Sequence, residues 1–263
     1  MTHTPLPRYP GKEWEVKPLN ASSLDEAVTR TVQTMRGARK VQNGKATNEL
    51  VLSAHVGGNQ DLFPQILQLY ISPGSKIADV TFGKGVFWRN VPEDEYKLLG
   101  TDIQTGVDCR NLPYDNGSID CVVLDPPYMH SPGGTTHSGQ NAFEDYYRNN
   151  GSGHQTTTKY HEAVLSLYVE ASREAFRVLK DRGVFIVNCQ DEVCSNRQRF
   201  THEEIMQACS EMGFIPEDLF VVVRSNKPGV SRAVKQVHAR KNHSYFLVFW
   251  KRIDGASIWQ PPT

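Results

Sequence analysis

The sequence predicts an α/β protein built on a largely parallel β-sheet. Short apolar runs, typical of strands buried on both faces, alternate with stretches of helical periodicity. Two of these runs end in polar motifs, a glycine-containing segment at 79–88 and an Asp-Pro-Pro-Tyr motif at 125–128. Ligands bind outside the carboxyl ends of the strands in open α/β sheets. We therefore expect both motifs to lie at one functional edge.

The composition indicates a soluble protein with no overall charge preference. The 263 residues include 29 basic and 29 acidic side chains, so total charge does not point to a polyanionic partner. The five cysteines form no C-x-x-C pair, which argues against a disulfide framework and a zinc site. No apolar run has the length of a membrane-spanning helix, and the N-terminus lacks a signal-peptide core. We expect a cytoplasmic protein that needs no metal.

The chain is predicted to begin with a short segment separate from its main domain. Residues 1–45 read as a proline-rich arm followed by one helix, which starts at the capping box formed by Ser23 and Glu26 and ends near Gly37. Residues 46–263 hold all the candidate chemistry, so they form the expected functional domain.

The main domain begins with a helix, a strand and a glycine-containing loop. Apolar residues at helical spacing around 62–70 predict the helix, and a buried strand follows at 76–80. Gly83 and Gly85, at the mouth of a predicted second helix, let the backbone turn tightly and approach a ligand closely. The dinucleotide fingerprint would place a third glycine at position 88, where this chain has a tryptophan. A nicotinamide or flavin pyrophosphate is therefore disfavoured.

Acidic residues follow the glycine loop at the ends of neighbouring segments. A second strand at 96–100 leads into Asp102, which is placed to accept hydrogen bonds from ribose hydroxyls. Asp108 follows in a loop, and a turn at Asn116-Gly117 leads into the next strand. Each acid could instead cap a turn. Their order, together with Asp79, favours a shared site along the sheet edge.

The strand at 120–124 ends abruptly in the Asp-Pro-Pro-Tyr motif. Neither proline can donate a ladder hydrogen bond, and the first one restricts the residue before it. The strand therefore delivers Asp125 and Tyr128 to its carboxyl end. A helix at 161–179 and a strand at 184–189 follow.

The last elements are a helix and two strands. A capping box of Thr201 and Glu204 begins the helix, which Gly213 ends. The strands are expected at 220–223 and 244–250.

Two insertions exceed what the sheet needs. Residues 129–160 are rich in glycine and small polar residues and carry the aromatic cluster Phe143, Tyr146 and Tyr147, which favours a lid or binding loop over a passive connection. Residues 224–243 contain no acid. A basic segment beside the functional edge favours a nucleic-acid interface over a solvated loop. Its candidate contacts are Arg224, Lys227, Arg232, Lys235, Arg240 and Lys241.

These motifs carry a family resemblance that extends from about residue 50 to 251. Residues 79–85 resemble the glycine-rich motif of S-adenosylmethionine-dependent class I methyltransferases, and residues 125–128 are similar to the D-P-P-Y motif of amino-methyltransferases acting on exocyclic nitrogens of nucleobases. Residues 55–64 resemble an additional cofactor motif placed upstream. The chain departs from the commoner F-x-G-x-G-T form at 86–88, which leaves cofactor contacts after Gly85 open.

The resemblance implies a class I methyltransferase Rossmann-like sheet, with helices on both faces and the last two strands as an antiparallel hairpin at one edge. It also implies S-adenosyl-L-methionine as cofactor. The implied catalytic residues are Asp125, Pro126, Pro127 and Tyr128. The implied cofactor-binding residues are Phe63, Asp79, Phe82, Gly83, Gly85, Asp102 and Asp108.

The implied reaction is methylation of a DNA base, with adenine N6 favoured because Asp125 stands where cytosine-N4 enzymes more commonly have serine. Asp125 and the Pro126 carbonyl would each accept one amino hydrogen, and Tyr128 would stack on a base flipped out of the duplex. Alternatives are a cytosine-N4 enzyme, an RNA base amino-methyltransferase, and a non-catalytic nucleic-acid-binding or cofactor-sensing protein. A DNA methylase would be solitary or part of a restriction–modification pair, and would work on the nucleoid.

Overall fold

The computed structural model describes residues 50–129, 147, 160–225 and 235–252. The chain divides into two units, Met1–Glu49 and Leu50–Thr263. The predicted arm and helix of residues 1–45 lie outside the described residues. So do most of the insertion at 129–160 and the middle of the insertion at 224–243.

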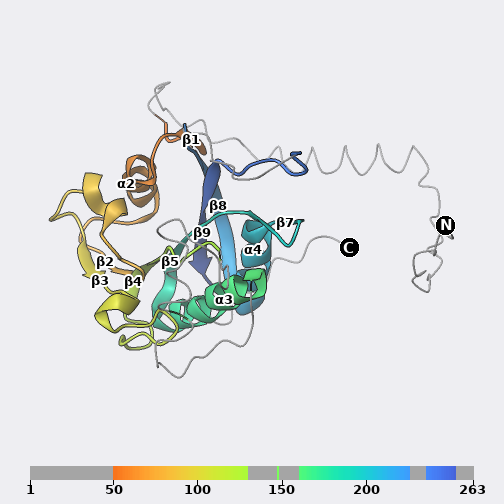
Figure 1. Ribbon diagram of the computed structural model, residues 1–263. Helices are drawn as coiled ribbons and strands as arrows, with labels where there is room; N and C mark the ends of the chain where they lie inside the picture. Colours follow the sequence, from red (N-terminus) through yellow and green to blue (C-terminus); the bar gives the residue numbers. More distant parts are fainter. Residues whose placement is uncertain (1–49, 130–146, 148–159, 226–234, 253–263) are drawn as a thin grey trace, which may run out of the picture. The chain divides into compact units, whose positions relative to one another are not determined.

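The described part of the larger unit is organised around a seven-stranded sheet with the order β1-β8-β9-β5-β4-β2-β3 (Figure 1). Its strands are β1 (Ala54–Val56), β2 (Lys76–Asp79), β3 (Lys97–Gly100), β4 (Ile119–Leu124), β5 (Leu179–Cys189), β8 (Phe214–Val223) and β9 (His243–Lys251). Four strand pairs are parallel, namely β1–β8, β2–β3, β2–β4 and β4–β5, whereas β9 runs antiparallel to β5 and β8. The predicted mostly parallel sheet with an antiparallel hairpin is confirmed.

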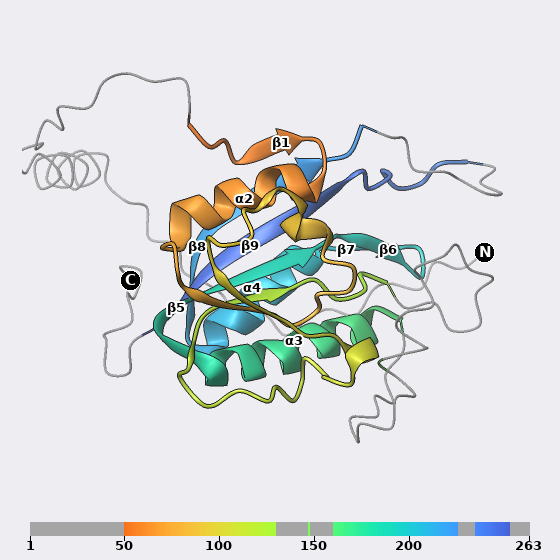
Figure 2. The same ribbon diagram turned by 90° about the vertical axis from the view of Figure 1, so that its left-hand side faces the viewer.

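Helices cover both faces of this sheet, as predicted. The helices are α2 (Asn59–Tyr70), α3 (Tyr160–Val178) and α4 (Thr201–Met212), with short 3-10 helices η1 (Val86–Asn90) and η2 (Ile103–Thr105). Figure 2 shows α2 and α3 on opposite sides of the central strands. Alternate residues of β5 separate accordingly: Phe185 and Val187 join the core under α3 and α4, whereas Val184 and Ile186 join the core under α2.

The predicted position of the C-terminal hairpin at a sheet edge is wrong. Strand β1 pairs in parallel with β8, with Ala54 opposite Val221, and so covers that edge. The three residues of β1 are at most partly buried and form no apolar run, so local pattern did not reveal them. Strand β8 is longer than the predicted strand at 220–223, since it begins at Phe214. An irregularity in its pairing with β9, between Pro216 and Asp218, accommodates the proline within the longer strand.

Two predicted local features also differ in the structure. The glycine loop leads into the 3-10 helix η1 and not into a longer α-helix. The capping box at the start of α4 is absent, since no side chain caps the helix. The Glu204 carboxylate instead lies 2.8 Å from Nε2 of the buried His161, whose Nδ1 lies 2.8 Å from Glu192. The two carboxylates outweigh the opposing effect of burial and raise the pKa of His161.

Glu192 belongs to a two-stranded hairpin that the sequence did not predict. Its strands are β6 (Glu192–Cys194) and β7 (Arg197–Arg199), which follow the carboxyl end of β5.

Within the described ranges, no helix is both long and apolar enough to cross a membrane.

Candidate active site

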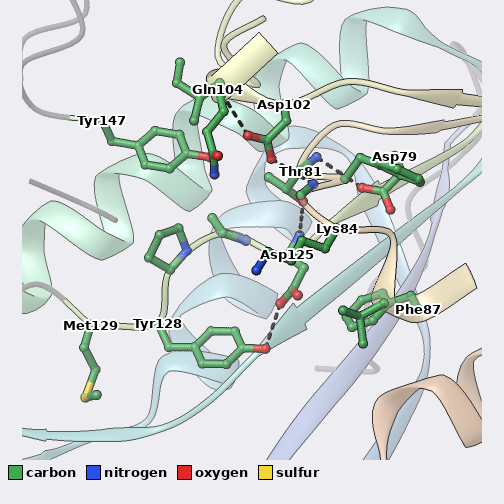
Figure 3. A pocket seen from close by; sticks show the side chains of 16 residues that line it. Asp79, Thr81, Lys84, Phe87, Asp102, Gln104, Asp125, Tyr128, Met129 and Tyr147 are labelled. Atoms are coloured by element: carbon green, nitrogen blue, oxygen red, sulfur yellow. Dashed lines mark hydrogen bonds between the residues drawn. The ribbon is translucent and has the colours of Figure 1, made fainter. Parts of the chain in front are cut away.

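A cavity of about 410 Å³ lies at the carboxyl ends of β2, β3 and β4 (Figure 3). Its volume falls within the range of small-molecule sites. Three segments line it: the glycine loop after β2, the turn after β3, and the Asp-Pro-Pro-Tyr motif after β4. Because β2 pairs in parallel with both β3 and β4, these three strand ends must meet at one edge.

The glycine loop is held by the buried carboxylate of Asp79, the last residue of β2. Its Oδ1 accepts a hydrogen bond from the Thr81 amide at 3.1 Å, and its Oδ2 accepts one from the Trp88 indole at 2.7 Å. Trp88, which replaces the third glycine of a dinucleotide fingerprint, therefore ties the loop to the strand. Burial raises the pKa of Asp79 to about 6, although both hydrogen bonds oppose the rise.

The two glycines adopt conformations that other residues rarely reach. Gly83 has φ 51° and Gly85 has φ 63°, both in the left-handed region. A Cβ at position 85 would also lie 2.7 Å from the ring of Phe82. The predicted need for glycine here therefore has two causes, backbone conformation and the packing of Phe82, which itself lines the cavity.

Asp102 joins the end of β3 to the glycine loop. Its Oδ2 accepts the Gly83 amide at 3.0 Å, and its Oδ1 accepts the Gln104 amide at 2.9 Å. The carboxylate also lines the cavity. Each carboxylate oxygen can accept a second hydrogen bond, so Asp102 can still bind a pair of ligand hydroxyls.

The Asp-Pro-Pro-Tyr motif completes the cavity wall. The Asp125 amide donates to Thr81 Oγ1 at 2.6 Å, and the Tyr128 hydroxyl donates to Asp125 Oδ1 at 2.7 Å. The two prolines line the cavity between them. Burial raises the pKa of Asp125 to about 7. The Tyr128 hydrogen bond and the charge of Arg224 oppose this rise, whereas the charge of Asp79 adds to it.

The structure brings together most of the residues predicted for this site, but not all. Gly85 belongs to the glycine loop but is not part of the cavity lining, and neither is Phe63. It is fully buried in α2, with its ring centroid 5.3 Å from that of Phe87, which does line the cavity. Phe63 therefore supports the wall from behind.

Asp108 likewise stands behind the wall. Its carboxylate is buried and forms an ion pair with Arg110 at 2.7 Å. Arg110 in turn donates to the Tyr147 carbonyl at 3.3 Å and lies over the Tyr147 ring, 5.8 Å from its centroid. Asp108 thus holds the arginine that positions Tyr147, a residue of the cavity lining.

A family model described as DNA methylase, covering N6 and N4 methyltransferases, matches residues 119–255, which is more than half of the chain. The chain belongs to this DNA methylase family. The match includes β4 and the Asp-Pro-Pro-Tyr motif at its end. No curated protein matches the chain.

Several solved structures are similar to this chain. A candidate DNA modification methylase from Thermus thermophilus, complexed with S-adenosyl-L-methionine, is 23% identical over 59% of this chain and 56% of that chain, with a TM-score of 0.36. TrmN from Thermus thermophilus is 15% identical over 74% of this chain and 50% of that chain, with a TM-score of 0.43. The [4+2]-cyclase SpnF is 14% identical over 88% of this chain and 95% of that chain, with a TM-score of 0.45. The chain spans about half the length of the two Thermus proteins.

Sequence reasoning missed several residues of the cavity. Thr81, Lys84, Phe87 and Gln104 line it. Thr81 and Lys84 lie within the predicted glycine loop, so their position was indicated although their role was not. Tyr147 is the one described residue of 130–159, and its aromatic cluster was the signal that could have identified it.

Four of the six predicted nucleic-acid contacts lie within the described residues, while Lys227 and Arg232 lie outside them. Arg224 follows the end of β8 and is near enough for its charge to oppose the rise in the pKa of both Asp125 and Tyr128. Lys235 and Arg240 are exposed. The Lys241 carbonyl accepts a hydrogen bond from Gln190 at 3.4 Å, which brings the insertion to the end of β5.

Replacing Trp88 by phenylalanine tests how the glycine loop is held. The variant leaves the buried Asp79 Oδ2 without its indole donor, so we expect a loss of about 1–3 kcal/mol in the free energy of unfolding. Asp79, whose pKa is raised to about 6, is ionised above that pH, and the indole hydrogen bond stabilises this ionised form. The loss should therefore be larger at pH 8 than at pH 5, measured by urea denaturation. Trp250→Phe, at a half-buried tryptophan packed against Tyr70, is the matched control, and an equal loss in both variants would contradict the assignment.

Proposed function

We propose that this protein transfers a methyl group from S-adenosyl-L-methionine to an exocyclic amino group of a base in DNA, with N6 of adenine as the favoured position. One observation carries the proposal. The Asp125 carboxylate, at the end of β4, lines the same cavity as the glycine loop and Asp102. An amino group and a cofactor bound in this cavity would therefore lie close together.

The cavity has features that suit this cofactor. Asp102 offers carboxylate oxygens to ribose hydroxyls, and Gly83 exposes backbone without a side chain. Phe82 and Ile103 add apolar walls that suit an adenine ring. When bound, S-adenosyl-L-methionine supplies an electrophilic methyl group.

The Asp-Pro-Pro-Tyr residues would activate the amino group. An exocyclic amine is a poor nucleophile because its lone pair is conjugated with the ring. Asp125 and the Pro126 carbonyl each accept one amino hydrogen, which favours a nitrogen whose lone pair is available for attack. Positive charge develops on this nitrogen in the transition state, so the carboxylate stabilises the transition state more than the ground state.

DNA is the proposed substrate, with the target base flipped out of the duplex. The amino group cannot reach Asp125 in this cavity while the base is stacked and paired, and the Tyr128 ring in the cavity wall offers a stacking surface. Stacking is worth about 1–3 kcal/mol per base, comparable to the few kcal/mol that flipping costs. The basic residues of 224–243 would contact the phosphates on either side.

Cytosine N4 is the second candidate position. The family model covers both N6 and N4 methyltransferases, and a carboxylate with an adjacent carbonyl can accept the hydrogens of either amine. The choice depends on which ring fits beside Tyr128.

Plasmid DNA from cells that express the protein tests the proposal directly. Nucleoside mass spectrometry should detect N6-methyladenine with the wild type and at most traces with Asp125→Ala. In single-turnover transfer the variant should be slower by about 10²–10³, the usual effect of removing one preorganised group, while calorimetry shows unchanged cofactor affinity. Asp94→Ala, at an exposed position, is the control. N4-methylcytosine in place of N6-methyladenine would overturn the choice of base, and methylation of neither base would overturn the function.

The rate of transfer should depend on pH through Asp125. The ionised carboxylate is the form that stabilises the positive charge developing on the amino nitrogen, and its pKa is raised to about 7. Below pH 7 the single-turnover rate should therefore fall about tenfold per pH unit, and above pH 7 it should level off. A rate that is constant between pH 5 and 8 would show that Asp125 is not the acceptor.

Alanine at Lys235, Arg240 and Lys241 tests the basic segment. Binding to all DNA sequences should weaken alike, and the slope of log affinity against log salt should decrease by up to about 0.9 for each lost phosphate contact. Filter binding at several salt concentrations measures this slope. Arg173→Ala, an exposed change on α3, is the control and should leave it unchanged. An unchanged slope in the triple variant would place the duplex elsewhere.

A further inference from the structure

A buried amide side chain lies directly behind the candidate catalytic pair. Asn188, near the carboxyl end of β5, is fully buried. Its Oδ1 is in contact with the Tyr128 hydroxyl, and its Nδ2 has no hydrogen-bond partner among the described residues. A buried polar group without a partner costs about 1–3 kcal/mol. An amide kept in place at this cost serves a purpose other than packing.

The hydrogens at this cluster can be counted. The Tyr128 hydroxyl carries one proton but has two oxygen neighbours, Asp125 Oδ1 at 2.7 Å and Asn188 Oδ1. One proton cannot be donated to both, and an ionised carboxylate has no proton to donate. Rotating the Asn188 amide by half a turn exchanges its oxygen and nitrogen, which are nearly the same in shape. Nδ2 then donates to the Tyr128 hydroxyl oxygen, the hydroxyl donates to Asp125, and Oδ1 becomes the amide atom without a partner among the described residues.

The backbone of Asn188 holds the amide in this place. Its carbonyl accepts a hydrogen bond from the buried Tyr168 hydroxyl of α3 at 3.0 Å. It is also paired with Phe246 of β9 in the sheet. The four preceding residues of β5, 184–187, are apolar and buried, so an aliphatic side chain would suit position 188 better if packing alone mattered. A chain of hydrogen bonds thus runs from β5 through Tyr128 to Asp125.

We propose that Asn188 is a positioning residue for methyl transfer, which fixes the Tyr128 hydroxyl as a donor to Asp125. This inference rests on the proposed role of Asp125 as the acceptor of an amino hydrogen. Asn188 does not line the cavity and touches neither reactant; it acts through Tyr128 alone. Donation by the amide makes the phenol a stronger donor, because linked hydrogen bonds polarise one another.

Loss of the Asn188 amide should change the pH dependence of methyl transfer. The groups that act on Asp125 are the Tyr128 hydroxyl and Arg224, which lower its pKa, and Asp79, which raises it. The charge of Cys189 in turn raises the pKa of Tyr128. Removing the Asn188 amide weakens the hydrogen bond from Tyr128, so the ionised form of Asp125 loses stabilisation. The pKa of Asp125 then rises, and the acid limb of the rate profile moves to higher pH.

Asn188→Leu removes the amide at nearly constant volume and is the test. Single-turnover transfer should be about three- to tenfold slower than wild type at pH 6, which corresponds to a displacement of roughly half to one pH unit. At pH 9 the rates should be within about twofold, and cofactor affinity should be unchanged. Tyr128→Phe should also displace the limb, and the double variant should add nothing to it, since both act on one chain. Ser172→Ala, a buried polar change in α3, controls for general loss of packing.

A measurement without turnover separates this inference from the proposed function. In protein with ¹³C-labelled aspartate, the titration of Asp125 should move to higher pH in Asn188→Leu even if no methyl transfer is detected. If this variant does not fold, the side-chain amide hydrogens of Asn188 provide the readout. They should exchange slowly in the wild type and faster in Tyr128→Phe. An unmoved Asp125 titration, an equal rate loss at every pH with additive effects in the double variant, or unchanged amide exchange would each overturn the positioning role.

Discussion

The hydrogen bond from the Asp125 amide to Thr81 Oγ1 is the constraint on which the rest of the site depends. It joins the loop after β2 to the motif after β4 at 2.6 Å, just beyond the last paired residues of the two strands. The next two residues are prolines, which have no amide hydrogen, so Asp125 is the last donor before them. This bond therefore fixes the start of the motif relative to the glycine loop, and the hydroxyl of Tyr128 is then held by Asp125 and Asn188.

The site gathers acidic residues in one buried place and stabilises each with hydrogen bonds. Burial raises the pKa of both Asp79 and Asp125, and the charge of Asp79 adds to the rise at Asp125, so both are more easily protonated than exposed carboxylates. Donors offset part of this cost: the Trp88 indole for Asp79, and the Tyr128 hydroxyl for Asp125. Trp88 is also where the chain departs from the usual glycine motif. The departure therefore supplies the indole donor to Asp79.

Local pattern predicted the elements and motifs but not the pairings between distant segments. The strand before Asp125 and the glycines at 83 and 85 followed from short apolar runs and from turn chemistry, and the structure has both. The pairing of β1 with β8 did not, because it depends on a partner distant in the sequence. The β6–β7 hairpin is local, but its strands have only three residues each and its turn, Ser195-Asn196, lacks the glycine that usually signals a two-residue hairpin. The capping box expected at the start of α4 is absent because the Glu204 carboxylate instead contacts His161, a residue distant in sequence.

The role of Tyr128 was only partly predicted from the sequence. Its ring was expected as a stacking surface, which would make the hydroxyl dispensable, but the hydroxyl donates to Asp125 and contacts Asn188. The two roles are compatible, because a phenol donates in the plane of its ring and leaves the face open to a base. The same bonds restrict rotation of the side chain, so the stacking surface is ordered before a base arrives. An ordered surface loses less conformational entropy on binding, which favours capture of a base that has already lost its stacking in the duplex.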